Sequence, residues 1–294
     1  MINKASDCIV KNGLDLPYKY IIVDEYQDTS FTRYNLLRNI CDSIGAKIMV
    51  VGDDWQSIYG FRGTNIEFFS HFEEYFENPQ RIFIEKTYRN PQELIDIAGS
   101  FIMKNPKQIR KSLKSPKNLK KPVKIIYPQK NPIEKREMIY NLIKDLSEKS
   151  DDVLILGRTN NNINQFIKHR NLVKKGNLKK DKFLRILDKT DKSMNNVYYR
   201  TLHSSKGLEA DNVVIINMVD DYLGFPSKLK THSVLNYVNT RNYDYKYSEE
   251  RRLFYVGLTR SKNNVYLISD KNNPSEFIEE LIDDSLENLE IIEY

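Results

Sequence analysis

The chain has 294 residues, of which 40% are hydrophobic and 29% are charged, and its net charge is +6. This composition fits a folded protein with a sizeable core and excludes a fully disordered chain. No run of about 20 apolar residues is present, which argues against a membrane span, and no apolar signal segment follows Met1. We therefore expect a cytoplasmic protein without a membrane partner.

Short apolar, β-branched runs alternate with helical patterns, which is typical of parallel α/β architecture. The pattern predicts strands at Tyr20–Val23, Lys47–Val51, Arg81–Glu85, Val123–Tyr127, Val153–Leu156, Val197–Thr201, Val213–Asn217 and Val265–Ile268. It predicts helices at Thr32–Ile44, Pro91–Met103, Pro132–Glu148, Asn161–Val173, Ser248–Leu258 and Pro274–Leu289. Each of the three prolines in these helices suits a first helical turn, where the missing N–H does no harm.

Two segments lack a regular pattern and are expected to be loops or linkers, namely Asn105–Pro122 and Tyr222–Tyr247. Lys and Arg cluster in Lys104–Lys124 and in Lys168–Lys182. A solvated surface and contact with a phosphate backbone explain these clusters equally well. The cysteines and histidines are scattered, so the sequence offers neither a zinc ribbon nor another metal cluster.

A domain boundary is expected near Asn78-Pro79. The piece before it holds only two clear strands, which is too few for a stable parallel sheet. We therefore interpret it as the second half of a domain whose first half is absent.

Polar residues follow the first two strands directly. Asp24 and Glu25 come after Tyr20–Val23, and in parallel sheets ligands bind beyond the carboxyl ends of strands. Such carboxylates can hold Mg²⁺ and orient or deprotonate a water molecule. A simple polar turn is the more frequent explanation of an Asp-Glu pair taken alone.

The loop Val51–Gly63 combines glycines, aromatic residues and an arginine. Aromatic side chains in such a loop can stack on unpaired bases. We favour base contact for Tyr59 and Phe61, and burial in the core for Trp55.

Three later segments carry groups suited to a nucleotide or to DNA. Tyr88 and Arg89 combine a ring that can stack on a base with a guanidinium that can pair with phosphate. The segment Thr201–Glu209 offers hydroxyls, an imidazole, an ammonium and a glycine turn. The helix Ser248–Leu258 ends just before Arg260, which can stabilise a phosphoryl group or simply interact with the helix dipole.

Taken in this order and spacing, the five segments resemble motifs II to VI of UvrD/Rep-type superfamily 1 helicases, over nearly the whole chain. Gly52–Gln56, Gly224–Pro226 and Asn273–Phe277 resemble the helicase IV branch of that family. The resemblance implies an α/β fold with parallel-sheet, RecA-like units. Residues 1–80 would be the C-terminal half of the first, ATP-binding unit, and residues 81–294 would be the complete second unit.

The resemblance also implies roles for single residues. At the nucleotide site these are Mg²⁺ ligation by Asp24, water activation by Glu25, γ-phosphate sensing by Gln56, adenine stacking by Tyr88, γ-phosphate contact by Arg89, lining of the site by Gly207 and Glu209, and an arginine finger from Arg260. At the DNA site they are contact with single-stranded DNA by Tyr59, Phe61, Thr201 and His203, and coupling of that contact to the nucleotide by Arg62.

The sequence departs from the family pattern in three ways. No glycine is followed by lysine, so the phosphate-binding P-loop Gly-x-x-x-x-Gly-Lys-[Ser/Thr] does not occur. About forty residues lead from Asn160 to Thr201, which leaves no room for the large accessory insertion of the family. The opening Met1–Ala5 resembles an internal stretch of such helicases.

The resemblance therefore implies part of an ATP-dependent 3′→5′ DNA helicase or translocase that uses ATP and Mg²⁺. Its partners would be single-stranded DNA and a P-loop-bearing N-terminal half, from the same gene or a split one, and the chain alone would be inactive. The alternative is a non-catalytic nucleic-acid-binding or regulatory protein derived from a helicase. The sequence leaves open the pathway, the DNA structure that is bound and the oligomeric state.

Overall fold

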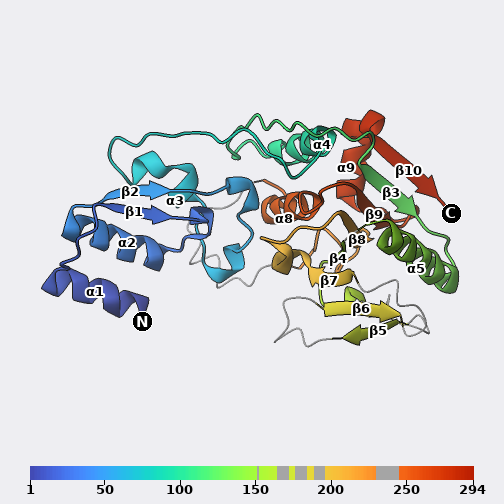
Figure 1. Cartoon of the computed structure of the whole chain (residues 1–294), viewed down its shortest axis with the longest axis horizontal. Helices are drawn as coiled ribbons and strands as arrows, with labels where there is room; N and C mark the ends of the chain where they lie inside the picture. The colour runs from blue at the N-terminus through green and yellow to red at the C-terminus, as the bar shows by residue number, and fades with distance from the viewer. Residues whose placement is uncertain (151, 164–171, 176–183, 189–195, 230–244) are drawn as a thin grey trace. The chain divides into compact units, whose positions relative to one another are not determined.

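The structure is a computed structural model that describes all residues except 151, 164–171, 176–183, 189–195 and 230–244 (Figure 1). The chain forms two compact units. The first contains Met1–Phe83, Lys107–Ile109 and the described part of Lys230–Glu249. The second contains Ile84–Pro106, Arg110–Leu229 and Glu250–Tyr294. In the described part of the chain, no helix is both long and apolar enough to cross a bilayer.

The first unit is built around two parallel strands. Its elements are α1 (Ile2–Asn12), β1 (Tyr20–Val23), α2 (Phe31–Ile44), β2 (Lys47–Val50) and α3 (Glu67–Ser70). The strands β1 and β2 pair in register from Tyr20 with Lys47 to Val23 with Val50. The α2 helix ends at Gly45, whose φ of 66° is a conformation that glycine adopts without strain.

One face of this small sheet is apolar and open to solvent. Tyr20, Ile22 and Met49 are 68%, 69% and 58% exposed, whereas the alternate residues of both strands are half-buried. Parallel sheets are ordinarily covered on both faces because their strands are apolar on both sides. The first unit therefore presents a sheet face of the kind that other proteins bury.

The second unit contains an eight-stranded sheet in the order β10-β3-β9-β8-β4-β7-β6-β5. Its strands are β3 (Val123–Tyr127), β4 (Val153–Gly157), β5 (Leu172–Lys175), β6 (Leu184–Asp188), β7 (Val197–Thr201), β8 (Asn212–Met218), β9 (Val265–Ser269) and β10 (Leu289–Glu293). The six strands from β10 to β7 are parallel, and β6 and β5 continue the sheet antiparallel. The fold class is thus α/β with a parallel sheet, as the sequence pattern predicts.

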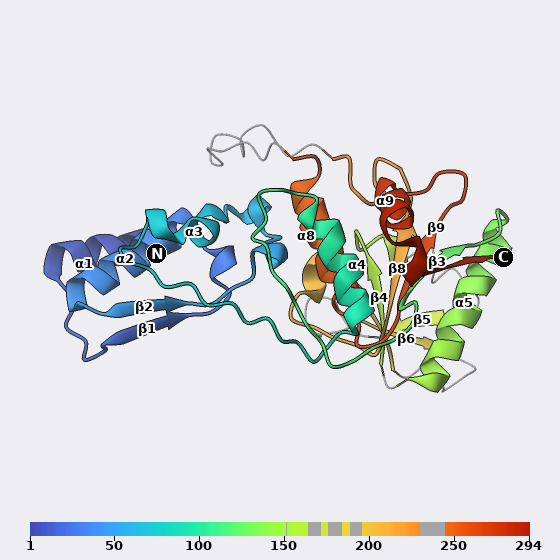
Figure 2. The same ribbon diagram turned by 90° about the horizontal axis from the view of Figure 1, so that it is seen from above.

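Helices cover both faces of this sheet (Figure 2). They are α4 (Gln92–Met103), α5 (Pro132–Lys149), α8 (Ser248–Leu258) and α9 (Glu276–Ser285). On one face, Ile139 and Ile143 of α5 join a buried cluster with alternate residues of the central strands. On the other face, Gly257 of α8 lies so close to Leu156 and Ile215 that a Cβ at this position would touch both side chains.

A buried ion pair and four aromatic rings join α4, α8 and α9. Phe101, Phe225, Phe254 and Phe277 contact one another with centroid separations from 5.0 to 5.7 Å. The guanidinium of Arg251 lies over Phe101 and Phe277, at 5.1 Å from each ring centroid. Its Nη1 and Nη2 donate to the two carboxylate oxygens of Glu280 on α9, at 2.7 and 2.5 Å. Lys104 completes the network through Glu280 and Asp284.

Two sequence-based predictions of elements are wrong, and a third is wrong in its last two residues. Residues 81–85 form no strand: their side chains are exposed, and the segment pairs only through an isolated bridge between Lys86 and Lys114. The helix expected to reach Leu289 ends at Ser285, because Leu289 begins β10 at the edge of the sheet beside β3. The helix expected over 161–173 falls mostly outside the described residues, and Leu172 and Val173 belong to β5.

The open sheet of the first unit should exchange its amide hydrogens faster than the covered sheet of the second. In the described residues β1 pairs only with β2, whereas β8 is fully covered between β4 and β9. We expect protection of Val213–Ile216 to exceed that of Ile21–Val23 by about 100-fold, because opening of β1 exposes fewer buried contacts. Hydrogen–deuterium exchange on the whole chain measures this, and equal protection of the two strands would contradict it.

The Arg251–Glu280 pair should make stability depend on acid pH. Burial alone would raise the pKa of Glu280, but the hydrogen bonds and charge of Arg251, with help from Lys104, lower it below its ordinary value. A lowered folded-state pKa stabilises the fold fully above the unfolded pKa of about 4.3, and this stabilisation is lost as pH falls through the folded pKa. Glu280→Gln should therefore lower the free energy of unfolding by about 3 kcal/mol at pH 7.

Urea denaturation followed by circular dichroism tests this at pH 7 and at the lowest pH at which the chain stays folded. The difference between wild type and Glu280→Gln should shrink as pH falls below about 4. Glu287→Gln, which changes an exposed carboxylate just after α9, serves as the control and should have little effect. A difference for Glu280→Gln that stays constant with pH would show that the ion pair does not supply this stability.

Candidate functional site

Two carboxylates lie at the carboxyl end of β1. Asp24 and Glu25 are exposed, and both border a cavity of about 400 Å³ between this strand end and α2. The backbone of Glu25 is left-handed, with φ of 53° and ψ of 38°. For a residue with a Cβ this conformation costs about 1–2 kcal/mol. Strain of this kind clusters at functional sites because the surrounding structure must maintain it.

The buried side chain of Gln27 links this strand end to the loop after β2. Its Nε2 donates to Glu25 Oε2 at 2.5 Å, and its Oε1 accepts from the backbone N–H of Asp53 at 3.1 Å. Gly52 makes this link possible, since a Cβ there would collide with Gln27 Oε1. Gln27 therefore fixes the orientation of the Glu25 carboxylate.

The loop after β2 is held by its own acids. Asp53 accepts from Trp55 N at 3.1 Å and from Gln56 Nε2 at 2.7 Å, so the Gln56 amide is oriented by its neighbour. Asp54 is buried and accepts from Gln108 Nε2 at 2.6 Å and from Ile109 N at 2.8 Å. Trp55 is also buried, with its indole N–H donating to the Ile109 carbonyl. The expectation that Trp55 belongs to the core is confirmed.

Farther along this loop, an arginine stacks on two rings. The guanidinium of Arg62 lies 4.7 Å from the centroid of Tyr59 and 5.4 Å from that of Phe61. The two rings meet edge to face at 6.1 Å, and Phe61 is 45% exposed. An exposed ring beside a guanidinium is a surface on which an unpaired base can stack while a phosphate meets the charge.

In the second unit, Arg89 and Glu209 form an ion pair. Arg89 Nε donates to Glu209 Oε2 at 2.8 Å, and Lys262 Nζ lies 3.3 Å from Glu209 Oε1. The hydrogen bond from Arg89, aided by Lys262, lowers the pKa of Glu209 below its ordinary value. The neighbouring Tyr88 is 70% exposed, and the ammonium of Lys86 lies 5.1 Å from its ring centroid. The structure thus brings together Tyr88, Arg89 and Glu209, which the sequence assigned to one site.

Asn90 ties this segment to the end of α8. Its buried Nδ2 donates to the carbonyls of Thr259, at 3.1 Å, and Ser261, at 2.6 Å. Between those two residues stands Arg260, which is only 2% exposed. Arg260 Nε donates to the Val256 carbonyl at 2.9 Å and Nη1 to the Leu208 carbonyl at 3.2 Å. Its guanidinium therefore stabilises the end of the helix and also reaches the segment that carries Glu209.

The segment after β7 begins with a capped turn. The Thr201 hydroxyl accepts from Ser204 N at 3.4 Å and lies 2.9 Å from Ser204 Oγ. His203 is half-exposed on this turn. Gly207 has φ of 79°, a backbone conformation that favours glycine. The hydroxyl of Thr201 thus already has a partner within the turn, and His203 and Gly207 stand next along the chain.

The chain also matches known proteins. Residues 5–77 match the UvrD/REP helicase N-terminal domain, and residues 168–272 match the UvrD-like helicase C-terminal domain. The chain is 28% identical to DNA helicase IV of Escherichia coli over 280 residues, which cover 95% of this chain and 38% of that protein. The chain belongs to the UvrD/Rep helicase family.

Other members of the family match shorter stretches of this chain or are identical to it at a similar fraction of positions. A probable DNA helicase of Mycoplasma pneumoniae is 26% identical over 85% of this chain and 43% of its own length. The ATP-dependent DNA helicase Rep of Buchnera aphidicola is 32% identical over 51% of this chain and 23% of its own. The chain spans about two fifths of the length of E. coli DNA helicase IV and of the M. pneumoniae protein.

A solved structure, the C-terminal domain of a possible DNA helicase from Lactobacillus plantarum, aligns with 70% of this chain and 98% of its own. Its TM-score is 0.42 and its identity is 14%.

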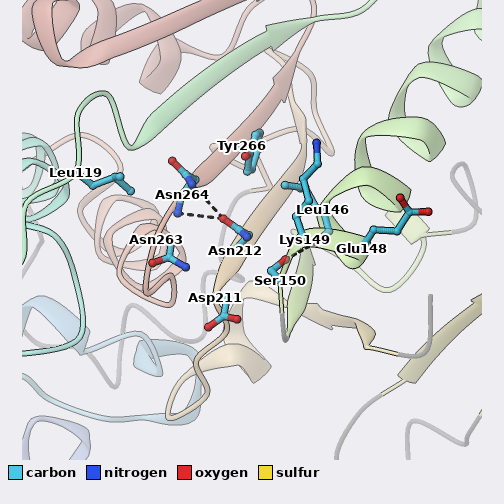
Figure 3. Close-up of a pocket in the computed structure, with 10 residues that line it drawn as sticks. All are labelled: Leu119, Leu146, Glu148, Lys149, Ser150, Asp211, Asn212, Asn263, Asn264 and Tyr266. Atoms are coloured by element: carbon cyan, nitrogen blue, oxygen red, sulfur yellow. Dashed lines mark hydrogen bonds between the residues drawn. The ribbon is translucent and has the colours of Figure 1, made fainter. Parts of the chain in front are cut away.

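Another cavity of the second unit lies away from the residues that the family resemblance marks. It measures about 570 Å³ and is bordered by the start of β8 and β9 and the end of α5 (Figure 3). Asn212 Oδ1 accepts from the backbone N–H of Asn264 at 3.2 Å and from its Nδ2 at 3.3 Å across the cavity wall. None of the predicted site residues lines it, so we do not assign it to the UvrD/Rep site.

The sequence alone missed three residues that position the site, namely Gln27, Asn90 and Lys262. Gln27 and Asn90 lie inside motif segments, but nothing in their spacing shows that their amides bond to backbone distant in sequence. Lys262 follows Arg260 by two residues, and its pairing with Glu209 depends on the bridge between Ala210 and Ser261. An amide within two residues of a candidate catalytic residue is the signal that could have pointed to Gln27 and Asn90.

Proposed function

We propose that this chain is part of an ATP-dependent DNA helicase motor that translocates 3′→5′ on single-stranded DNA. The observation that carries the proposal is the placement of Asp24 and Glu25. They follow a parallel strand, border a cavity, and include a strained residue whose carboxylate is oriented by a buried amide. Membership of the UvrD/Rep family supports the same activity, and relatives are named as ATP-dependent DNA helicases.

We further propose that residues 1–80 are the C-terminal half of a first RecA-like domain and that residues 81–294 are the second. The open, apolar face of β1 and β2 supports an incomplete first domain, because parallel strands are ordinarily covered on both sides. A polypeptide that carries the P-loop, in the same gene product or in a split partner, would complete it. It would also supply the phosphate-binding backbone of the P-loop, because this chain contains no Gly-Lys pair.

Asp24 fits the role of a Mg²⁺ ligand. In the described part of the chain, no group of three or more His, Cys, Asp or Glu side chains could enclose a metal ion. Mg²⁺ does not need such a cage, because it is held by one or two carboxylates together with waters and substrate phosphates. When bound, Mg²⁺ would neutralise charge on the phosphates. Glu25 would then take the proton of the attacking water, and Gln56 would sense the γ-phosphate.

The second unit would contribute Tyr88 as the adenine platform, Arg89 as a γ-phosphate ligand, and Gly207 and Glu209 as the lining of the site. The pair of Arg89 with Glu209 supports this, because an incoming phosphate could replace the carboxylate as the partner of Arg89. We propose that Arg260 acts as the arginine finger by exchanging its bond with the Leu208 carbonyl for one with phosphate. Its burial and its backbone partners equally fit a purely structural role, which makes Arg260 the most informative residue to test.

The DNA site would be formed by Tyr59, Phe61, Thr201 and His203, with Arg62 coupling the rings of Tyr59 and Phe61 to the nucleotide site. The contacts of Arg62 with both rings support this coupling, since a base that displaces one ring must also move the guanidinium. In the alternative hypothesis the chain binds nucleic acid without hydrolysing ATP, and only the ring surface of Phe61 would then matter.

The catalytic assignment can be tested by supplying the missing half. We expect no DNA-stimulated ATPase activity from the chain alone, and activity once it is fused behind the P-loop-bearing part of E. coli DNA helicase IV. In the fusion, Glu25→Gln should abolish turnover but leave ATP binding intact, because it removes the base and keeps the shape. Arg260→Ala should lower turnover by roughly 10³-fold or more. Steady-state ATPase rates against single-stranded DNA concentration measure both effects.

Two controls separate chemistry from folding. Glu74→Gln, an exposed carboxylate of the first unit, should leave turnover unchanged. Arg260→Lys keeps a charge at the same helix end, and the melting temperature of each Arg260 variant reports any loss of structure. Near-normal turnover of a folded Arg260→Ala fusion would mean that Arg260 only stabilises the end of α8. An active chain without the added half would contradict the half-domain proposal.

The ring assignment predicts a binding defect. Phe61→Ala should weaken the affinity of the chain for single-stranded DNA by about 1–3 kcal/mol if the ring stacks on a base, and Phe61→Trp should retain it. Phe31→Ala, which removes another exposed ring of the same unit, is the matched control and should bind normally. Fluorescence anisotropy with a labelled oligonucleotide gives the affinities, and equal affinity of Phe61→Ala and wild type would exclude the stacking role.

A further inference from the structure

The residues between α4 and β3 form an extended, basic segment on the second unit. The sequence from Lys104 to Lys124 contains nine Lys or Arg residues and no Asp or Glu. We name its part Arg110–Lys121 the basic strap. Apart from an isolated bridge at Lys114, the basic strap has no regular secondary structure. Its position must therefore be fixed by contacts with the rest of the unit.

Such contacts are present along the basic strap. Lys114 exchanges two backbone hydrogen bonds with the segment before Tyr88, donating to the Glu85 carbonyl at 2.7 Å and accepting from Thr87 N at 2.9 Å. The Lys117 carbonyl accepts from Gln92 N at 2.7 Å.

Side chains of α4 hold the backbone of the basic strap as well. Ser115 N donates to Gln92 Oε1 at 2.7 Å, and Leu119 N donates to Glu93 Oε2 at 2.8 Å. The basic strap is thus held at several points, and little conformational freedom remains to be lost on binding a ligand.

Exposure alternates along the basic strap. Leu113, Ser115, Lys117 and Leu119 are half-buried, whereas the residues between them are exposed. This is the period of an extended chain, in which successive side chains point to opposite sides. The cations Lys114 and Lys120 fall on the exposed side, and Arg110 and Lys121 are exposed as well.

Seven of the nine basic residues from Lys104 to Lys124 divide into two groups. Lys117 Nζ donates to the Lys262 carbonyl and to Asn263 Oδ1, Lys104 pairs with Asp284, and Lys124 pairs with Glu290. These three are occupied by structural contacts. Arg110, Lys114, Lys120 and Lys121 make no ion pair with any residue that the structure describes.

Carboxylates nearby keep their charge, but none of those that the structure describes forms an ion pair with these four cations. Of the nearby acids on α4, Glu93 binds the Leu119 N–H and Asp96 accepts from Gln92 Nε2 at 2.8 Å. Glu85 adds one exposed carboxylate beside Lys114, and Lys86 adds a further cation there. A fixed row of like charges in solvent is matched best by a ligand that carries a row of opposite charges.

We propose that the basic strap binds the sugar–phosphate backbone of DNA, as a track separate from the ring surface of Tyr59 and Phe61. The proposal goes beyond the proposed function, because none of the strap cations lies in a motif segment. From Lys114 to Lys120 an extended chain covers roughly 20 Å. One strand of a duplex rises by about 3.4 Å per phosphate along the helix axis, so the basic strap is long enough to run beside several successive phosphates. Contact through ammonium and guanidinium groups alone is independent of base sequence and sensitive to salt.

The test uses the full chain and a strap variant that combines Arg110→Gln, Lys114→Gln and Lys120→Gln. Lys121 is left unchanged because its backbone has a φ of 49°. The matched control combines Lys130→Gln, Lys135→Gln and Arg136→Gln, which remove the same number and kinds of charge around the start of α5. Fluorescence anisotropy gives the Kd for a labelled 20-nucleotide strand and for the matching duplex over a series of salt concentrations.

The strap variant should bind single-stranded DNA about tenfold or more weakly at low salt, and its plot of log affinity against log salt should be shallower by about 2. The control variant should bind within about twofold of wild type and keep the slope. A variant that combines Lys114→Arg and Lys120→Arg should retain binding. Melting temperatures confirm that all variants are folded, and comparison with the duplex shows whether the track also accepts paired strands.

Three results would overturn the proposal. They are equal losses in the strap and control variants, unchanged binding by the strap variant, and no binding of DNA by the wild-type chain at low salt. If the strap variant binds normally while Phe61→Ala binds weakly, the basic strap is only a solvated surface and the proposed helicase function stands. If the strap variant binds weakly while Phe61→Ala binds normally, the basic strap is a DNA track and the assignment of the rings fails.

Discussion

Parallel strands in this chain are apolar on both sides, so each face of a sheet must find a cover. In the second unit α5 covers one face and α8 the other, and the core between them is continuous. In the first unit the same constraint is met on one face of β1 and β2 only. The loops that carry the polar chemistry follow these strands directly, so the covering of the sheets also decides how firmly those loops are held.

The polar residues after β1 and those around Arg89 are organised in the same way. In each group the amide of one side chain bonds to backbone that is distant in the sequence. Gln27 orients Glu25 and accepts from the backbone of the loop after β2, and Asn90 anchors the segment of Arg89 on the end of α8. A carboxamide suits this task because it donates and accepts without carrying charge. It can therefore fix a charged neighbour without changing the charge of the site.

Strands were the most predictable part of the fold, because β4, β8 and β9 are continuous apolar runs that only a doubly covered strand explains. The edge strand β10 was missed, since its alternating Leu289–Glu293 pattern continues a helical one and becomes a strand only beside β3. Residues 81–85 have strand composition but lack a neighbouring strand. Propensity is local, whereas strand pairing depends on residues far away in sequence.

The motif residues of the site could also be named from the sequence, because their order and types are distinctive. The burial and the hydrogen-bond partners of each side chain could not be predicted from the sequence. The sequence offers Arg260 as a ligand of a phosphoryl group or as a partner of the helix dipole, and the structure buries it against carbonyls of its own helix and of Leu208. The partners of Glu209 and the left-handed backbone of Glu25 depend likewise on tertiary contacts, which no spacing encodes.

The two hydrogen bonds of Asn90 have a consequence for how the second unit can respond to a ligand. They clamp the carbonyls on either side of Arg260, while Arg89 adjoins Asn90 in the chain. The backbones that carry the two arginines are thus tied together through one side chain, although the arginines lie 171 residues apart in the sequence. A shift of the backbone at one arginine should therefore reach the backbone at the other, while each guanidinium can still turn about its own side-chain bonds.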